Sequence, residues 1–364
     1  DAVMPRLDTR PTATVAHPPY QLPPPTRTLV GRAEQLHDVS VALWSAAKAR
    51  RPVLGVISGP AGSGKTALAL TVGRMVRDAF PDGQLYLSMR GTDPAGATTP
   101  RSALGALLRS VDPGRGTLPH SVDHRAAMLH DAVAGRRMLV VLDDVVDAAE
   151  LRPLIASVGP AVLVTSRSGL AHLDGQVHVD LGPLTGAHSL QLLTDLVGRE
   201  RVQAEPSAAE AIVRACDGLP LAVRAASARL VARPRWPLAT LADRLADPDR
   251  RLDELACGDL DVRASILGGY RRVAAAERAA FRLLGRLLGR LDHAEFSARL
   301  VAALLECPAP VGERIAERLV DARLLEHLAP AEDGAYRYRM DGLIRLVARE
   351  RAVAEDRVPA PACG

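Results

Sequence analysis

Lysine and asparagine are almost missing from this chain of 364 residues. Lys48 and Lys65 are the two lysines, so 46 − 2 = 44 of the basic residues are arginine, and asparagine does not occur. We attribute this bias to a GC-rich genome rather than to chemistry. A lysine that stands inside a motif is therefore informative.

Cysteine pairs and long apolar runs are also missing. The four cysteines are widely spaced with no C-x-x-C pair, which argues against a zinc site or a disulfide framework. No apolar run reaches the ~18 residues of a membrane span, and the N-terminus lacks a signal-peptide pattern. We therefore expect a cytoplasmic protein with no membrane partner. Because the chain does not begin with Met, we expect a piece of a longer protein.

The net charge of +4 is small for this length, and acidic residues lie among the arginines. Such mixed charge is typical of solvated faces rather than of a nucleic-acid track. A hydrophobic content of 48% excludes global disorder. The length fits two or three domains.

The order of patterns along the chain predicts an α/β domain first. Residues 1–27 are rich in proline and predict a linker, with structure starting near Leu29. Short apolar runs then alternate with helical patterns up to residue 183, which is typical of a parallel sheet with helices on both faces. The predicted strands are 53–58, 84–89, 138–143, 161–166 and 177–181. The predicted helices are 33–50, 64–78, 101–109, 121–134 and 148–156.

The second half predicts two further domains. A helical subdomain covers 184–257 without strands, and its predicted helices are 187–197, 208–216, 221–232 and 238–245. Residues 258–352 have the order of a winged helix, and 353–364 predict a flexible tail. The winged-helix elements are helices at 277–288, 296–304 and 311–323, strands at 324–328 and 335–340 around a turn at 332–334, and a closing helix at 343–352.

The segment 59–66, GPAGSGKT, matches the phosphate-binding pattern G-x-x-x-x-G-K-[ST]. Its glycines allow backbone N–H groups to converge on phosphate oxygens, Lys65 adds a point charge, and Thr66 offers a hydroxyl to Mg²⁺. The alternative is an ordinary glycine-rich turn. The nucleotide-binding residues expected in and after the loop are Gly59, Gly62, Ser63, Gly64, Lys65, Thr66 and Ala67.

Two acidic residues follow the predicted strand 138–143. Asp143 is expected to bind Mg²⁺, and Asp144 to polarise an attacking water, so both are candidate catalytic residues together with Lys65. The alternative is a pair of helix N-caps. Arg167 ends the next strand, where ligands bind in open α/β sheets, and we expect it to sense a γ-phosphate. A surface arginine is the alternative.

These motifs, in this order, resemble NB-ARC domains, the nucleotide-binding switches of the STAND class of P-loop NTPases. Val30-Gly31-Arg32, the P-loop, LVVLDD, LVTSR and then Gly218-Leu219-Pro220-Leu221-Ala222 carry the resemblance over about residues 28–352. The local sequence is similar to the actinobacterial version in SARP-type transcriptional regulators of the AfsR kind. The resemblance implies an ADP-bound off state, an ATP-bound on state and slow hydrolysis.

The resemblance also implies further roles. Val30 and Arg32 would contact the adenine, Pro220 would pack on it, and Arg167 would be the sensor arginine. The winged helix would be a lid over ADP, and the open form could oligomerise. The upstream DNA-binding effector and the downstream helical-repeat sensor of such regulators are not recognisable in this chain.

The lid departs from the family at one pair. Tyr338-Arg339-Met340-Asp341-Gly342 aligns with a family motif whose histidine touches the ADP β-phosphate, and Asp341-Gly342 replaces its His–Asp pair. A carboxylate near a phosphate is unfavourable. We therefore expect ADP to be retained weakly, or through other contacts.

Two other functions remain as alternatives. A DNA-binding winged helix with an attached ATPase would need a basic reading helix, but 311–323 carries three acidic and three basic residues. A P-loop small-molecule kinase would need an acceptor pocket, which the helical region does not predict.

Overall fold

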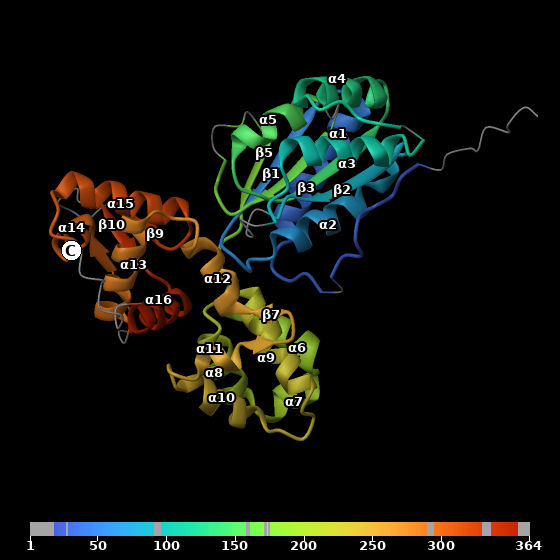
Figure 1. Ribbon diagram of the computed structural model, residues 1–364. Coiled ribbons are helices and arrows are strands. Elements are labelled where there is room, and N and C mark those ends of the chain that lie inside the picture. The colour runs from blue at the N-terminus through green and yellow to red at the C-terminus, as the bar shows by residue number, and fades with distance from the viewer. Residues whose placement is uncertain are drawn as a thin grey trace, which may run out of the picture.

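The computed structural model describes residues 18–26, 28–90, 96–114, 116–157, 161–170, 173, 175–289, 295–329 and 336–355. Three lobes are visible in Figure 1: a sheet lobe (residues 18–183), a helical lobe (184–261) and a C-terminal lobe (275–355). Helix α12 (Val262–Tyr270) lies between them.

The sheet lobe contains five parallel strands in the order β2-β3-β4-β1-β5. Helices in the connections to β2, β3 and β4 return the chain to the same end of the sheet before each of these strands, as parallel pairing requires. The strands are β1 (Val53–Ser58), β2 (Gly83–Ser88), β3 (Met138–Val145), β4 (Ala161–Ser166) and β5 (Val177–Asp180). The predicted α/β class with a parallel sheet is therefore confirmed.

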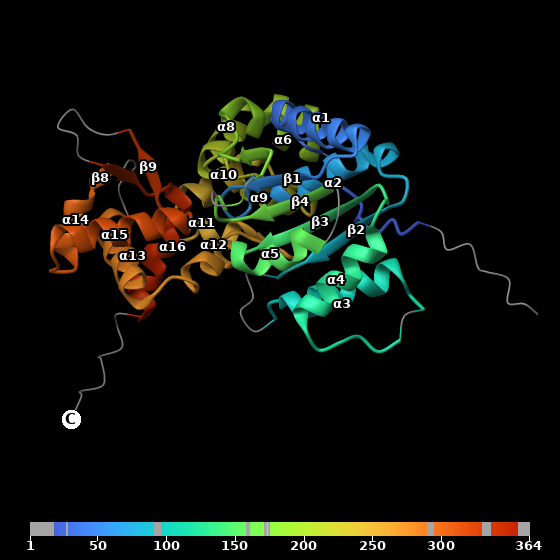
Figure 2. The same cartoon turned by 90° about the horizontal axis from the view of Figure 1, so that it is seen from above.

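Helices cover both faces of this sheet (Figure 2). Alternate residues of each central strand enter opposite cores: Leu139 and Val141 pack with α1 and α2, whereas Val140 and Leu142 pack with α3, α4 and α5. This alternation explains why the strands read as continuous apolar runs. The helices are α1 (Ala33–Ala49), α2 (Lys65–Met75), α3 (Pro100–Val111), α4 (Val122–Val133) and α5 (Ala148–Ser157), with a 3₁₀ turn at Arg77–Ala79.

The prediction that ordered structure starts near Leu29 is wrong for residues 18–26. Tyr20 forms a parallel bridge with Gln84 at the β2 edge, and Gln84 N–H donates to the Pro19 carbonyl at 2.7 Å. A Cβ on Gly73 of α2 would lie 2.5 Å from Leu22, so the glycine leaves room for this segment. Proline suits an edge position of this kind, because it needs no ladder donor there.

The helical lobe follows the predicted order with additions. Its helices are α6 (Gly186–Val197), α7 (Arg199–Ala204), α8 (Pro206–Ala215), α9 (Pro220–Val231), α10 (Leu238–Ala246) and α11 (Arg251–Glu254). The sequence did not predict α7, α11 or α12. Two-residue strands, β6 (Ala256–Cys257) and β7 (Leu260–Asp261), also correct the expectation of no strands here.

The C-terminal lobe packs helices against a small antiparallel sheet of order β8-β10-β9. Its elements are α13 (Ala275–Leu288), β8 (Glu295–Ser297), α14 (Ala298–Leu304), α15 (Ala309–Asp321), β9 (Glu326–Leu328), β10 (Arg337–Arg339) and α16 (Gly342–Glu355). The predicted helix 296–304 is wrong at its start, because Phe296 lies in β8 and pairs there with Tyr338 of β10. Helix α16 continues past residue 352, while the predicted turn 332–334 and residues 356–364 lie outside the described residues.

One apolar core joins the helical and C-terminal lobes through α12. Within the part of the chain that the structure describes, no helix has the length and apolar character needed to span a bilayer.

Candidate functional site

The loop between β1 and α2 has the backbone that its glycines predict. Gly59, Gly62 and Gly64 have φ angles of 148°, 80° and 96°. A Cβ on Gly62 would lie 2.7 Å from Leu221, so this glycine also permits the helical lobe to approach the loop. Side chains with a Cβ rarely adopt such angles, which explains the residue type at each position.

Lys65 begins α2 and turns back over the loop. Its Nζ donates to the carbonyl oxygens of Gly59 and Pro60 at 2.9 and 2.8 Å. Burial, with a smaller contribution from the positive charge of Arg167, lowers the pKa of Lys65 to about 8. The ammonium is therefore positioned by backbone carbonyls at the start of a helix, where anions are favoured.

Asp143 lies at the centre of a hydrogen-bond network at the end of β3. Its Oδ1 accepts from Thr66 and Thr165 at 2.7 and 2.6 Å, and its Oδ2 accepts from Tyr86 at 2.9 Å. Burial and the adjacent Asp143 carboxylate raise the pKa of Tyr86, so the phenol stays protonated and donates. The sequence did not single out Tyr86 or Thr165.

The contact between Thr66 and Asp143 also bears on Mg²⁺. Hydroxyl and carboxylate oxygens are ligands that this ion prefers. Among the described residues, no three His, Cys, Asp or Glu side chains come together as a metal cluster. The residues present therefore fit an ion that takes one or two protein oxygens and completes its shell with phosphate and water.

Asp144 has a left-handed backbone with φ of 57°, where the β3–β4 pairing is irregular. Its N–H donates to Thr165 Oγ1 at 3.0 Å, and its carboxylate lies 3.8 Å from Arg167 Nε. The alternative reading of the acidic pair as helix caps is not supported, because Asp147 supplies the carboxylate at the start of α5.

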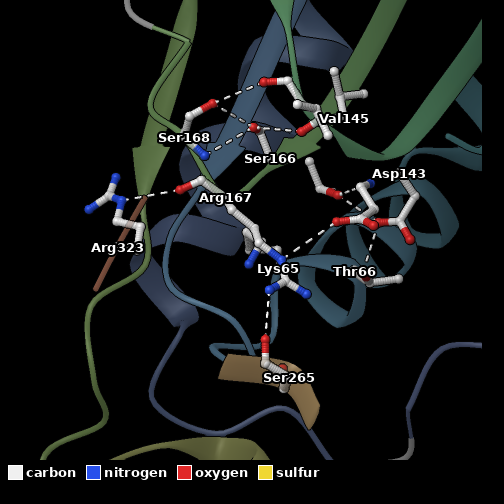
Figure 3. Close-up of polar contacts among 12 residues, drawn as sticks. Lys65, Thr66, Asp143, Val145, Ser166, Arg167, Ser168, Ser265 and Arg323 are labelled. Atoms are coloured by element: carbon white, nitrogen blue, oxygen red, sulfur yellow. Dashed lines mark hydrogen bonds and ion pairs between the residues drawn. The ribbon is translucent and has the colours of Figure 1, made fainter. Parts of the chain in front are cut away.

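Arg167 connects the sheet to α12 rather than lying free on the surface (Figure 3). Its Nη1 donates to the Ser265 carbonyl at 2.8 Å, and its side chain is 17% exposed. A Cβ on Gly268 of α12 would lie 3.1 Å from the same guanidinium nitrogen. The guanidinium therefore contacts α12 as well as the carboxylate of Asp144.

A cavity of about 500 Å³ brings the predicted residues together. Its polar end is formed by Lys65, Thr66, Asp143, Asp144 and Arg167, and its apolar end by residues of the sheet and helical lobes. The apolar end is lined by Leu29, Val30, Leu184, Leu192, Pro220 and Leu221. The predicted loop residues Gly62, Ser63, Gly64 and Ala67 also line it. A polar end beside an apolar end is suited to a ligand that carries phosphates on an aromatic base.

Two residues that are predicted to bind the nucleotide make other contacts in the structure. Gly59 does not line the cavity; its backbone serves the turn and accepts from Lys65. Arg32 lines it, but its guanidinium donates to the carbonyl oxygens of Gly182 and Ser63 at 2.6 and 3.5 Å. Arg32 therefore buttresses the P-loop.

Contacts between lobes surround this cavity. Leu221 N–H donates to the Gly62 carbonyl at 3.2 Å. Arg323, after α15, donates through both terminal nitrogens to Asp180 at 2.8 and 3.0 Å, and through Nε to the Arg167 carbonyl at 3.2 Å. The sequence predicted neither Arg323 nor Asp180 as a site residue.

The Asp341-Gly342 pair lies beside a second, smaller cavity of about 60 Å³, which shares Ala61, Ser63 and Arg167 with the first. Asp217 of the helical lobe accepts from Leu343 N–H at 3.4 Å, and a Cβ on Gly342 would lie 3.1 Å from this carboxylate. Burial and the carboxylates of Asp217 and Glu326 raise the pKa of Asp341 to about 6.

Comparison with known proteins places these features in context. Residues 36–203 match the NB-ARC domain family. The regulatory proteins AfsR of Streptomyces coelicolor and Streptomyces griseus are 42% and 41% identical to the chain over 95% and 94% of its length. The chain spans about a third of the length of each, 34%.

Among solved structures, the Aeropyrum pernix ORC2 protein, described in ADPNP–ADP complexes, has a TM-score of 0.56. The match covers 93% of this chain and 97% of the ORC2 chain. At a sequence identity of 16%, it shows the fold alone. The parallel sheet, the P-loop and the extent of the sequence match support one conclusion: this chain is similar to the AfsR regulatory proteins along a segment that includes an NB-ARC domain.

Proposed function

We propose that this chain is a nucleotide-dependent switch module, closed and inactive with ADP and open and active with ATP, within a transcriptional or signalling regulator that acts in the cytoplasm. The observation that carries the proposal is the composition of the main cavity. Its phosphate end comes from the sheet lobe, whereas Pro220 and Leu221 of the helical lobe close its apolar end. A ligand that fills both ends favours one arrangement of the lobes, and only such differential contact shifts an equilibrium.

The site residues divide between binding and slow hydrolysis. Lys65 would bind the β- and γ-phosphates, and the loop N–H groups would surround them. Val30 and Pro220 would enclose the adenine from two lobes. Thr66 and Asp143 would bind Mg²⁺, which neutralises phosphate charge when present. Asp144 would orient a water, and its contact with Arg167 would restrain that carboxylate.

Arg167 links nucleotide state to lobe position in this proposal. In the arrangement described here its guanidinium contacts Asp144 and the Ser265 carbonyl of α12. A γ-phosphate would compete for the same guanidinium, because a phosphate oxygen is a stronger acceptor than a backbone carbonyl. Losing the α12 contact would loosen the joint between the sheet lobe and the remainder of the chain.

We also propose the domain boundaries 28–183, 184–257 and 258–352, with the last region a winged helix that closes as a lid. The order of α13, β8, α14, α15, β9 and β10 supports this assignment. The contacts of Arg323 with Asp180 and with the Arg167 carbonyl would maintain the closed form. They supply the alternative contacts expected where the family histidine is replaced by Asp341. An open form would expose these surfaces for homo-oligomer formation.

Charge pairing in and just after α15 disfavours DNA reading by this module. Arg318 pairs with Glu277 at 2.9 Å, and Arg323 pairs with Asp180. Of the three basic residues predicted in 311–323, two are therefore already paired with carboxylates within the chain. A DNA-reading helix presents its basic side chains to phosphates and bases.

The two lysines provide a matched test of the proposed function. Lys65→Ala should remove the nucleotide that co-purifies, identified by chromatography after denaturation, and weaken ADP binding by roughly a hundredfold or more, since a buried charge-assisted contact is lost. Lys48→Ala, in α1, should change neither result. Wild-type nucleotide content in Lys65→Ala would show that the site is assigned wrongly.

A further inference from the structure

A further concave pocket of about 450 Å³, separate from the two cavities described above, lies where the end of α12 meets α13 and α16. Four arginines line it, from three separate helices or their ends: Arg271, Arg278, Arg282 and Arg351. It shares no lining residue with the nucleotide cavity.

The charge of this pocket is unbalanced. Glu355 is the acidic residue among its lining residues, so four arginines and one glutamate leave a formal charge of 4 − 1 = +3. Glu355 is already engaged, because its Oε2 accepts from Tyr270 at 2.8 Å and from Arg282 at 3.1 Å. Tyr270 OH in turn accepts from Arg282 at 2.9 Å. This carboxylate therefore orients one arginine and leaves the others without compensation.

The other three arginines differ from most arginines of this half of the molecule. Arg263 pairs with Glu350, Arg318 with Glu277 and Arg349 with Asp249. In the described part of the chain, the side chains of Arg271, Arg278 and Arg351 form no hydrogen bond or ion pair, and Nε of Arg351 is excluded from solvent without a partner. A buried guanidinium N–H without an acceptor is costly.

We propose that this pocket is an anion site for a phosphate-bearing ligand, distinct from the nucleotide site. A carboxylate brings one negative charge, whereas a phosphate monoester brings nearly two and three strong acceptor oxygens. The planar guanidinium fork matches phosphate geometry. A residual charge of +3 on convergent arginines is therefore better matched by phosphate than by an acidic side chain.

The ligand could be a small phosphate compound or a phosphorylated side chain, and two probes distinguish these sources. Inorganic pyrophosphate and free phosphoserine are each titrated calorimetrically, without Mg²⁺, into the chain saturated with ADP. The titrations are repeated with the Lys65→Ala variant, which removes the contribution of the P-loop to anion binding by an independent route. Binding at one site in both backgrounds is expected, and a preference between the probes identifies the source.

Arg278→Gln and Arg351→Gln should each weaken probe binding by roughly tenfold, because each removes a charge-assisted contact. Arg314→Gln, an exposed arginine of α15 outside the pocket, should bind as the wild type does. Affinity should also fall as ionic strength rises. Because Arg351 is partly buried, the unfolding midpoint of the Arg351→Gln variant is measured as well. If Arg351→Gln is unstable, Arg278→Gln alone decides the test.

The proposal is overturned if neither probe binds, or if Arg278→Gln and Arg314→Gln bind equally well. Pyrophosphate binding that disappears with ADP saturation and in Lys65→Ala would assign the anion to the P-loop and also overturn it. None of these outcomes depends on ADP acting as an off signal, so the switch function and this site can fail separately.

Discussion

The phosphate end of the cavity and the contacts between the lobes lie at the same edge of the sheet, but they are built differently. At the phosphate end, residues 59–66 form one continuous segment, a loop and the start of α2, and the buried Asp143 accepts from three donors. Between the lobes, Arg167, Asp180 and Arg323 meet from positions up to 156 residues apart.

Exposure separates the two regions as well. Asp143 is 7% exposed, whereas the side chains of Arg323 and Asp180 are 27% and 57% exposed. A buried network is expensive to disrupt, and an exposed ion pair contributes little. The comparison sets a buried network at the phosphate end beside an exposed ion pair between the lobes, an arrangement that suits the proposed switch.

The largest effect is expected at Asp143. Asp143→Ala would leave the Thr66, Thr165 and Tyr86 hydroxyls without their shared acceptor, destabilising the fold by about 1–3 kcal/mol. Mg²⁺-dependent ATP hydrolysis, measured as phosphate release, should fall by roughly 10²-fold or more. Wild-type turnover in this variant would contradict both the Mg²⁺ assignment and the role of the buried network at the phosphate end.

The interface should respond more mildly at Arg323. Arg323→Gln removes the Asp180 pair and should weaken closure by about 0.5–1 kcal/mol, given the exposure of both side chains. ADP release, followed by stopped-flow with a fluorescent analogue, should accelerate two- to fivefold, and high salt should reduce the difference. Asp180→Asn should have no added effect in the Arg323→Gln background. Additive effects would mean that the pair does not act as a unit.

Gly268→Ala tests whether the position of Arg167 depends on α12. Alanine is favoured over glycine inside a helix by roughly 0.5–1 kcal/mol. The new Cβ would lie 3.1 Å from Arg167 Nη1, which opposes that gain. We expect little net change in the unfolding midpoint but altered ADP release. In the Arg167→Ala background, the same substitution should stabilise the protein; an identical outcome in both backgrounds would refute the contact.

The smallest effect is expected at Asp341. Its pKa of about 6 lies above the ordinary value, so the folded protein binds this proton more tightly than the unfolded chain. The resulting stabilisation is complete below the unfolded pKa near 4 and is lost as pH rises through 6. Because the side chain is 45% exposed, the effect should stay below about 1 kcal/mol.

Thermal unfolding at pH 5 and pH 7 measures this contribution. The wild-type midpoint should fall more on going to pH 7 than that of Asp341→Asn, whose side chain does not titrate. Equal pH dependence of the midpoint in both proteins would show that Asp341 does not contribute to stability through its titration. Asp341→His, in contrast, tests whether the family histidine increases ADP retention.

Elements with a strong local signal were predicted closely. Strands β1 and β4 begin and end as predicted, because both faces are buried and the run is apolar throughout. The sequence predicts one helix over residues 296–304, since the apolar residues there fit the helical period. Pairing of Phe296 with Tyr338 instead places its start in a sheet. The spacing of apolar residues within a segment cannot reveal a strand partner that lies 42 residues away in the sequence.

The candidate site divides in the same way. The P-loop, Asp143, Asp144 and Arg167 could be proposed from the sequence because their chemistry requires a defined residue type at a defined strand end. Tyr86, Thr165, Asp180 and Arg323 were missed because each is an ordinary residue whose role depends on its neighbour in space. Residues 18–26 were missed because proline content predicts a linker, yet here it suits a sheet edge.

By itself, the sequence determined the parallel sheet and the phosphate loop. Apolar runs that alternate with helical patterns are typical of such a sheet, and glycines with one lysine at fixed spacing predict such a loop. The tertiary structure alone decided how the lobes meet, through Arg167 on Ser265 and Arg323 on Asp180. In a chain with 44 arginines, arginine identity carries almost no information about partners. Only the three-dimensional arrangement, which brings Ser265 of α12 to Arg167 and Arg323 to Asp180, selects which arginines bind across the interface.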